Sequence, residues 1–450
     1  MSDLRFVLDW TLIILSTVLA FKSYRRIIYA SRASVGEYVF LVLWVFCCLP
    51  IFFDYLIGRP TYTTVYWYQV FIISNADDAV SCIYDSIILV ACILLYMYSK
   101  HASRNSARPS KKWGGLIFDN KPLLILLVVS PVLYIVATGH TSNYLVYGVT
   151  SFRGLSGNSV STVVSGLLLV SVLAFCNLFF KRQRLVFTDV IVLIAYSFAA
   201  AWIEGKRFII AIMILLYFYY FMQRNPSEKV RRRLEFGLPI AVVVLLFFSG
   251  FYLMFFRPLS DTGFNSVYEM LRVDYGRDDV VKYVIYHEFF LHDHILEYYG
   301  ESFLSTFLVW VPRSVWSGKP YQHYQYLTSS ILNLPIDQLP AGTTPCWFEM
   351  CIANFSHFGI VLSWVLLVLF VWLSDRTKSI STESILMMLI IVLLTQSVDA
   401  YFSFLVVLGI QYVLGFLFEQ GKRGVSNIPM RRGASSLASV NRHHRDNAVM

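Results

Sequence analysis

The sequence predicts an all-α polytopic membrane protein, and three observations lead to this class. Of the 450 residues, 57% are hydrophobic and only 14% are charged, whereas about a quarter of the residues of a soluble domain are charged. Apolar runs of about 20 residues, the length that crosses a bilayer as a helix, recur along the chain. Short basic loops separate these runs, and this charge pattern is the one that orients membrane helices.

We expect about eleven transmembrane helices from these runs. The first run has no small-residue cleavage site after it and is followed by a basic segment, so it is predicted to be a retained helix and not a removed signal peptide. One transmembrane domain is expected over 1–420, followed by a disordered cytoplasmic tail over 421–450. The predicted spans cover 6–22, 37–57, 79–98, 122–138, 159–180, 186–203, 207–222, 238–256, 347–373, 385–398 and 402–418.

The basic loops predict the orientation of the chain. With the N-terminus outside and the C-terminus in the cytoplasm, about 26 of the 37 Lys and Arg residues become cytoplasmic. The longest outward segment is then one large extracytoplasmic loop over 257–346. Within it, 266–299 is amphipathic and predicts interfacial helices, the first opened by a capping box from Ser266 to Glu269. The short apolar run 303–311 suits an interfacial or re-entrant helix.

Charge placement and motif content exclude several classes of protein. The net charge of +9 does not predict a nucleic-acid partner, because the excess basic residues lie in short loops between apolar runs. The chain lacks a Gly-rich phosphate loop, so ATP hydrolysis is not expected. Five of the seven cysteines fall within apolar runs, where cysteine acts as a small hydrophobic residue, and no disulfide framework is predicted. No cofactor is expected.

Basic residues on the outward face are candidate binding residues, because the orientation rule disfavours them there. Most are arginine, whose planar guanidinium binds phosphate through paired hydrogen bonds. Those at the outer ends of spans are placed to meet at one cavity; snorkelling or ion pairs with acids of the loop are the structural alternatives. The predicted anion-binding residues are Arg153, Arg207, Arg257, Arg272, Arg277, Arg313 and Lys319.

Acids and histidines supply candidate general bases. Glu349 lies at or just inside the start of a predicted span, where an ionisable group is costly unless it is paired or functional. His294 and Asp278, in the long loop, are the other two predicted catalytic residues. Asp85, about seven residues inside the third span, is either a further functional acid or half of a buried pair that stabilises the bundle.

The segment from His287 to His294 contains three histidines and two acids. His287 and His292 are five residues apart, whereas the two ligands of a zinc-binding helix motif are four apart. We therefore predict no metal site. Two alternatives stay open: one of these histidines contacts phosphate or transfers a proton, or the segment is a solvated helical face.

Three segments resemble the Wzy-type O-antigen and oligosaccharide repeat-unit polymerases of bacterial envelopes. They are EGKRFIIA at 204–211, VPRSVWSGKP at 311–320 and TTPCWFEMCIANFSHFGI at 343–360. The order of many spans, one large extracytoplasmic loop and a few closing spans is also similar over about 150–375. Ser317 departs from the pattern, because many members of this family have proline there.

The resemblance implies a membrane-embedded glycosyltransferase with a GT-C-like fold in the bacterial cytoplasmic membrane. Such an enzyme joins oligosaccharide repeat units carried on undecaprenyl diphosphate into an O-antigen, capsule or exopolysaccharide chain on the outer face. Its partners are the lipid-linked donor and acceptor and the bilayer, with a chain-length regulator and a flippase as candidate protein partners. Arginines can stabilise the diphosphate leaving group without a metal.

Two other functions remain open at this point. An O-antigen ligase shares the fold and transfers the finished chain to a lipid core sugar. A glycolipid flippase or transporter belongs to a different class, and it would show intramembrane charges along a path through the membrane and internal repeats. We find no internal repeat, and the charged residues cluster on one face, so the polymerase is the preferred prediction.

Overall fold

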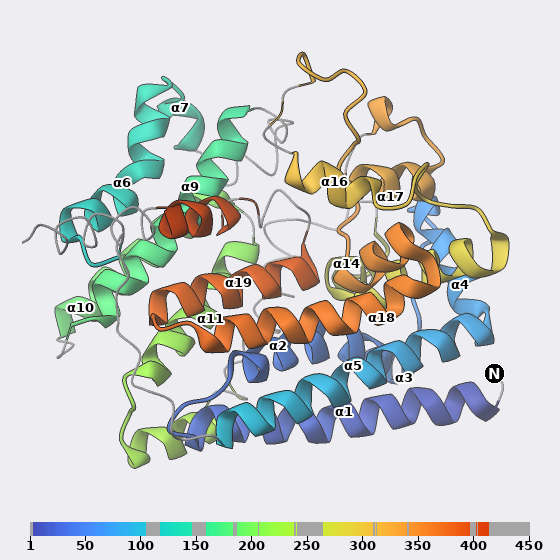
Figure 1. The fold of residues 1–450 in the computed structure, drawn as a ribbon, viewed down its shortest axis with the longest axis horizontal. Helices are drawn as coiled ribbons and strands as arrows, with labels where there is room; N and C mark the ends of the chain where they lie inside the picture. Colours follow the sequence, from blue (N-terminus) through green and yellow to red (C-terminus); the bar gives the residue numbers. More distant parts are fainter. Residues whose placement is uncertain are drawn as a thin grey trace, which may run out of the picture.

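In the part of the chain that the structure describes, every regular element is a helix (Figure 1). The all-α class predicted from the sequence is therefore confirmed. This computed structural model describes residues 3–104, 118–145, 159–182, 187–205, 207–237, 240, 264–308, 311, 313–339, 342–396, 402 and 404–413. The predicted tail 421–450 and nearly all of the predicted span 238–256 lie outside these residues.

Six helical segments are long and apolar enough to cross a membrane, which supports the predicted membrane class. Shorter apolar helices lie at other predicted spans: α6 (Lys121–Ala137), α11 (Arg207–Gln223), α19 (Ile380–Thr395) and a helix at Phe404–Val413. The six long segments are α1 (Asp3–Tyr29), the run of α2 (Val35–Leu43), η1 (Trp44–Cys48) and α3 (Leu49–Ile57), α5 (Asp78–Arg104), α9 (Ser159–Phe180), α10 (Phe187–Glu204) and α18 (Trp347–Arg376).

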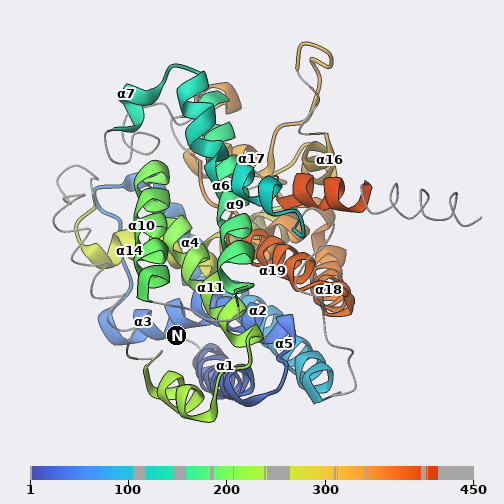
Figure 2. The ribbon, with the colours of Figure 1, turned by 90° about the vertical axis from the view of Figure 1, so that its left-hand side faces the viewer.

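Helices α1, α2, α5, α18 and α19 form a central bundle, which Figure 2 shows nearly end-on. Its close approaches depend on small residues: a Cβ on Gly36 of α2 would lie 2.1 Å from the Ser99 hydroxyl oxygen of α5. At one end of α2, Ser34 caps the helix by accepting from the Gly36 N–H, and its hydroxyl donates to Asp375 of α18 at 2.6 Å. Helices α6 and α9 pack against each other beside this bundle.

The long loop contains short helices rather than a continuous one. Ser266 caps α14 (Val267–Tyr275) by accepting from the Glu269 N–H at 3.1 Å, as the sequence predicts. The other short elements are η2 (Tyr66–Tyr68), α4 (Gln69–Ala76), α7 (Thr141–Tyr144), α15 (Arg277–Ile285), η3 (Tyr286–Leu291), α16 (Glu301–Phe307), α17 (His323–Leu332) and η4 (Ile336–Gln338).

The expectation that the first part of this loop lies on the membrane surface is wrong for α15. All nine of its residues are buried, and it packs against α4, α5 and α18 inside the protein. An amphipathic pattern cannot separate a surface helix from one whose polar face meets other polar side chains. The polar residues of α15 are of this second kind.

Helix α18 is broken in its N-terminal third. Ser356 has φ 50° and ψ −133°, which no helix contains. The segment before the break folds back on the segment after it: the Trp347 indole N–H donates to the Ser363 carbonyl at 3.0 Å. The span predicted over 347–373 is therefore two helical arms joined at Ser356, and only the second runs uninterrupted to Arg376.

We predict that Gly359→Ala destabilises this fold-back. A Cβ at Gly359 would lie 2.0 Å from the Cys351 carbonyl oxygen, so the two arms must separate. Overpacking of this kind costs about 1–3 kcal/mol, and the purified protein in detergent should unfold at a lower temperature. Gly409→Ala is the matched control, because no atom lies within 4 Å of its Cβ position. Equal unfolding temperatures for the two variants would contradict the close packing.

Candidate functional site

The predicted anion-binding arginines separate into groups in the structure. Arg153 and Arg257 lie outside the described residues, and of Arg207 only its place at the start of α11 is described. Arg272 and Arg277 are both buried, at the end of α14 and the start of α15. The remaining two, Arg313 and Lys319, lie on the turn after α16.

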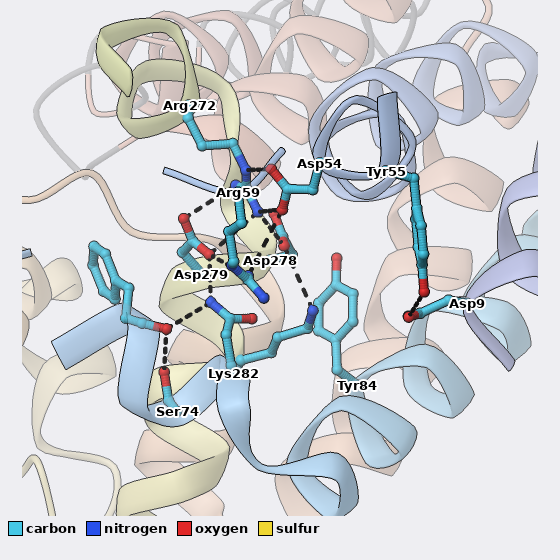
Figure 3. Close-up of polar contacts among 12 residues, drawn as sticks. Asp9, Asp54, Tyr55, Arg59, Ser74, Tyr84, Arg272, Asp278, Asp279 and Lys282 are labelled. Carbon is cyan, nitrogen blue, oxygen red and sulfur yellow. Dashed lines mark hydrogen bonds and ion pairs between the residues drawn. The ribbon is translucent and has the colours of Figure 1, made fainter. Parts of the chain in front are cut away.

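Arg272 is the centre of a buried ion cluster (Figure 3). Its guanidinium is 2.6 Å from Asp278, 3.1 Å from Asp279 and 3.1 Å from Asp54 of α3. Arg59 pairs with Asp279 at 3.3 Å, and the Lys282 ammonium lies 3.7 Å from Asp278. We call these six residues the ion cluster: Asp54, Arg59, Arg272, Asp278, Asp279 and Lys282.

The charges of the ion cluster balance, with three cations facing three acids. Burial by itself would lower the pKa of the Arg272 guanidinium, but its acidic partners outweigh burial and hold that pKa well above its usual value. Burial would likewise raise the pKa of the Asp278 carboxyl, and Arg272 and Lys282 hold it below its usual value. This arrangement favours a structural role for Arg272 and Asp278, two residues predicted to bind substrate or act as a base.

Arg277 is buried without such compensation. Its Nε and Nη2 both donate to the Thr395 carbonyl, at 3.2 and 2.9 Å, and its guanidinium lies 5.5 Å from the Phe46 ring centroid. Among the described residues no carboxylate is in ion-pair contact with it, and burial lowers its pKa. Thr395 is the last residue of α19, so this carbonyl carries part of the negative end of the helix dipole. The guanidinium charge is therefore only partly balanced, by this carbonyl and by the Asp274 carboxyl at longer range.

Glu349, a predicted catalytic residue, is fully buried at the start of α18. One carboxylate oxygen accepts from the Cys346 N–H at 3.0 Å, which closes a capping box. The other lies 2.7 Å from Nε2 of His323 on α17. The sequence did not single out His323, because it stands alone between Gln322 and Tyr324 with no motif spacing.

The opposite side of the His323 ring is also bonded. Its Nδ1 lies 2.9 Å from the Ser302 hydroxyl of α16, which accepts from the Asn354 side-chain amide at 2.6 Å. A neutral imidazole with its hydrogen on Nε2 satisfies every group, because Ser302 then donates to Nδ1 and His323 donates to Glu349. Helices α16, α17 and α18 thus hold the His323–Glu349 pair in one orientation.

A small pocket adjoins both buried features. His323, Cys346, Met350, Leu393 and Gln396 are among its lining residues, and its cavity volume is about 10 Å³. Gln396 follows the carbonyl that Arg277 contacts, and Cys346 lies beside Arg277. This volume is about that of one water molecule and far below that of small-molecule sites, so a headgroup or a sugar could enter only if the walls of the pocket moved apart.

The other predicted residues lie elsewhere. His294 is about half exposed and its Nδ1 is 2.7 Å from Glu288. The Arg313 guanidinium is exposed and sits 3.8 Å from the Tyr321 ring centroid, and the Lys319 ammonium donates to the Val311 carbonyl at 2.9 Å. None of the three lines the pocket. Within the described part of the chain, no three His, Cys, Asp or Glu side chains are grouped as metal ligands.

None of the family models, curated proteins and solved structures with which the chain was compared matches it. What the site can do chemically follows from its own residues. Arg277 offers positive charge to an anion, and the His323–Glu349 pair offers a place for a proton. Of these three residues, His323 lines the pocket, and Cys346 on the pocket wall contacts Glu349 and lies near Arg277.

We predict that Arg272→Met destabilises the protein strongly. The change leaves three buried acids facing two cations, and breaking a buried ion pair in this way costs about 3–5 kcal/mol. Arg232→Met is the matched control, because its pair with Glu228 is more than two-thirds exposed and such pairs contribute about 0–1 kcal/mol. Thermal unfolding in detergent measures both. If Arg272→Met matched the control in stability, the cluster would not be structural.

Proposed function

We propose that the chain is a membrane-embedded glycosyltransferase that polymerises oligosaccharide repeat units carried on undecaprenyl diphosphate. The product would be an O-antigen, capsule or exopolysaccharide chain on the outer face of the bacterial cytoplasmic membrane. The observation that carries the proposal is the buried Arg277, which is in contact with no carboxylate of the described residues and lies near the pocket that His323 lines. The resemblance to Wzy-type polymerases supplies the substrate class.

Arg277 fits the leaving group of this reaction. A buried guanidinium without a carboxylate is costly, and an anionic ligand removes that cost. The contacts with Thr395 use Nε and Nη2 and leave the hydrogens of Nη1 for a phosphate oxygen. A positive charge that is already fixed stabilises the developing charge of a diphosphate more effectively than water does.

The His323–Glu349 pair fits the acceptor side. An acceptor hydroxyl that replaces Ser302 at Nδ1 of His323 would give its proton to that nitrogen as its oxygen bonds to the anomeric carbon of the donor. The bond from that carbon to the diphosphate breaks, and the diphosphate takes the electron pair beside Arg277. Glu349 would hold the imidazolium through the 2.7 Å contact to Nε2, as a buried carboxylate does in other proton-transfer pairs.

The finer features of this proposal come from the sequence. They are about eleven spans, a GT-C-like fold and an N-terminus on the outer side. Arg153, Arg207 and Arg257 remain predictions as further diphosphate ligands, and Arg313 and Lys319 as contacts for the lipid-linked chain outside the pocket. The pocket has room for about one water molecule, so a headgroup would need its walls to open, and the growing chain would lie beyond it.

Arg277→Met should abolish polymerisation and leave single repeat units on the carrier lipid. The Arg277→Lys variant keeps the positive charge but lacks the planar guanidinium and its paired N–H donors, so it should give shortened polymer. The assay is polymer length on gels from cells in which the variant replaces the wild-type chain, with membrane levels checked by immunoblot. Arg232→Met, an exposed arginine, should give wild-type lengths. Long polymer with Arg277→Met would refute the proposal, and polymer accumulating on the carrier would instead identify a ligase.

Glu349→Gln should slow polymerisation by about 10²–10⁴-fold, the usual contribution of general-base catalysis, because the protonated His323 imidazole loses the carboxylate that stabilises it. The glutamine can still accept from the Cys346 N–H, so the start of α18 stays capped. His294→Gln is the matched control, since this half-exposed histidine lies outside the pocket. Rates of chain extension with purified lipid-linked units measure the difference. If His294→Gln were inactive and Glu349→Gln active, His294 would be the base and the His323–Glu349 pair would have no part in proton transfer.

A further inference from the structure

Two carboxyl groups face each other inside the central bundle. Asp9 of α1 is 2% exposed and Asp85 of α5 is 1% exposed. The two helices pack along each other, and the Asp85 carboxyl interacts with that of Asp9. Each acid lies about 10 Å from the first residue of its helix, at 1.5 Å per residue. The pair is therefore at the same depth on both helices.

The pair has too few hydrogen-bond donors for two carboxylates. The Tyr55 hydroxyl of α3 donates to one oxygen of Asp9 at 2.7 Å, and Nε of Arg5 lies 3.8 Å from the same oxygen. The other Asp9 oxygen and both Asp85 oxygens are buried with no hydrogen-bond donor among the described residues. Burying three carboxylate oxygens without hydrogen-bond donors costs a large amount of folding free energy.

The nearby cations do not supply the missing charge. Lys282 on α15 faces Asp85, but it belongs to the ion cluster, where three cations already match three acids. In Figure 3 the Lys282 ammonium lies against the Tyr84 ring, 4.9 Å from its centroid. Arg5 is shared with Asp78 at 3.1 Å. One shared cation is left for two buried acids.

We propose that Asp9 and Asp85 form a proton-binding site that holds one proton between the two carboxyl groups. The protonated carboxyl donates to its partner, so one of the bare oxygens becomes a donor and another an acceptor. The pair then carries a single negative charge, which the shared Arg5 partly balances. Two adjacent carboxyl groups in a low dielectric lose their protons in separate steps, because the second charge is repelled by the first.

The remaining groups that face the pair do not take over this role. Two of these groups are the neutral hydroxyls of Tyr55 and Tyr84, and a third is the thiol of Cys82. Asp78, at the start of α5, adds negative charge. Loss of the proton would add a second negative charge opposite Lys282. Lys282 lies on α15, the helix that begins with Arg277. Proton binding by this pair does not require that the protein be a glycosyltransferase.

The test is pH-difference infrared spectroscopy on the full chain in lipid nanodiscs. We expect the wild type to show a carbonyl-stretch component of a protonated carboxylic acid that shifts in D₂O and disappears at high pH. Asp85→Asn and Asp9→Asn should each remove that component, because an amide donates to the remaining carboxylate and replaces the proton. Asp3→Asn, an exposed acid on α1, is the control and should leave it.

Other outcomes would overturn the proposal. No such component in the wild type, or one that survives unchanged in both variants, would show that the pair holds no proton. A sodium ion is the competing ligand, and it requires both acids ionised. Thermal unfolding in sodium chloride against choline chloride separates the two: a sodium-dependent rise that Asp85→Asn abolishes would replace the proton by Na⁺. Both variants are isosteric, and normal unfolding temperatures verify that they fold.

Discussion

The ion pairs of the Arg272 guanidinium are the interaction on which the packing of the long loop depends. It joins three acids from α3 and α15 to α14, so it ties the long loop to the membrane bundle in a single buried contact. Helix α15 can be buried only because its acids and its lysine meet opposite charges there. Without that match, a helix with four charged residues would not stay buried inside the protein.

Once α15 is fixed, the position of Arg277 follows. This residue begins the helix that the ion cluster anchors, and it reaches the end of α19. The His323–Glu349 pair is held separately, by the capping box of α18 and by the Ser302–Asn354 contact. Two independent supports therefore bring a cation and an acid–imidazole pair to one pocket.

The sequence was sufficient for the class and for the start of α14, because composition, apolar length and capping residues act locally. It also placed Glu349 at the start of a helix, where the structure buries it, while its catalytic role stays a prediction. It could not separate Arg272 from Arg277, since both are outward arginines in one polar stretch and only tertiary contacts distinguish a neutralised charge from an uncompensated one. His323 and the burial of α15 were missed for the same reason: their partners are distant in the chain.

The fold-back of α18 has a mechanical consequence. The arm that carries Glu349 is fastened to the membrane arm by the Trp347–Ser363 hydrogen bond and by the contact of Gly359 with Cys351. The Asn354 carbonyl on the same arm also accepts from the Gly300 N–H. These contacts join the segment that carries Glu349 and the long arm of α18 into one rigid unit. An opening of the pocket that would admit a larger ligand must therefore come from its other side, which α17 and α19 form.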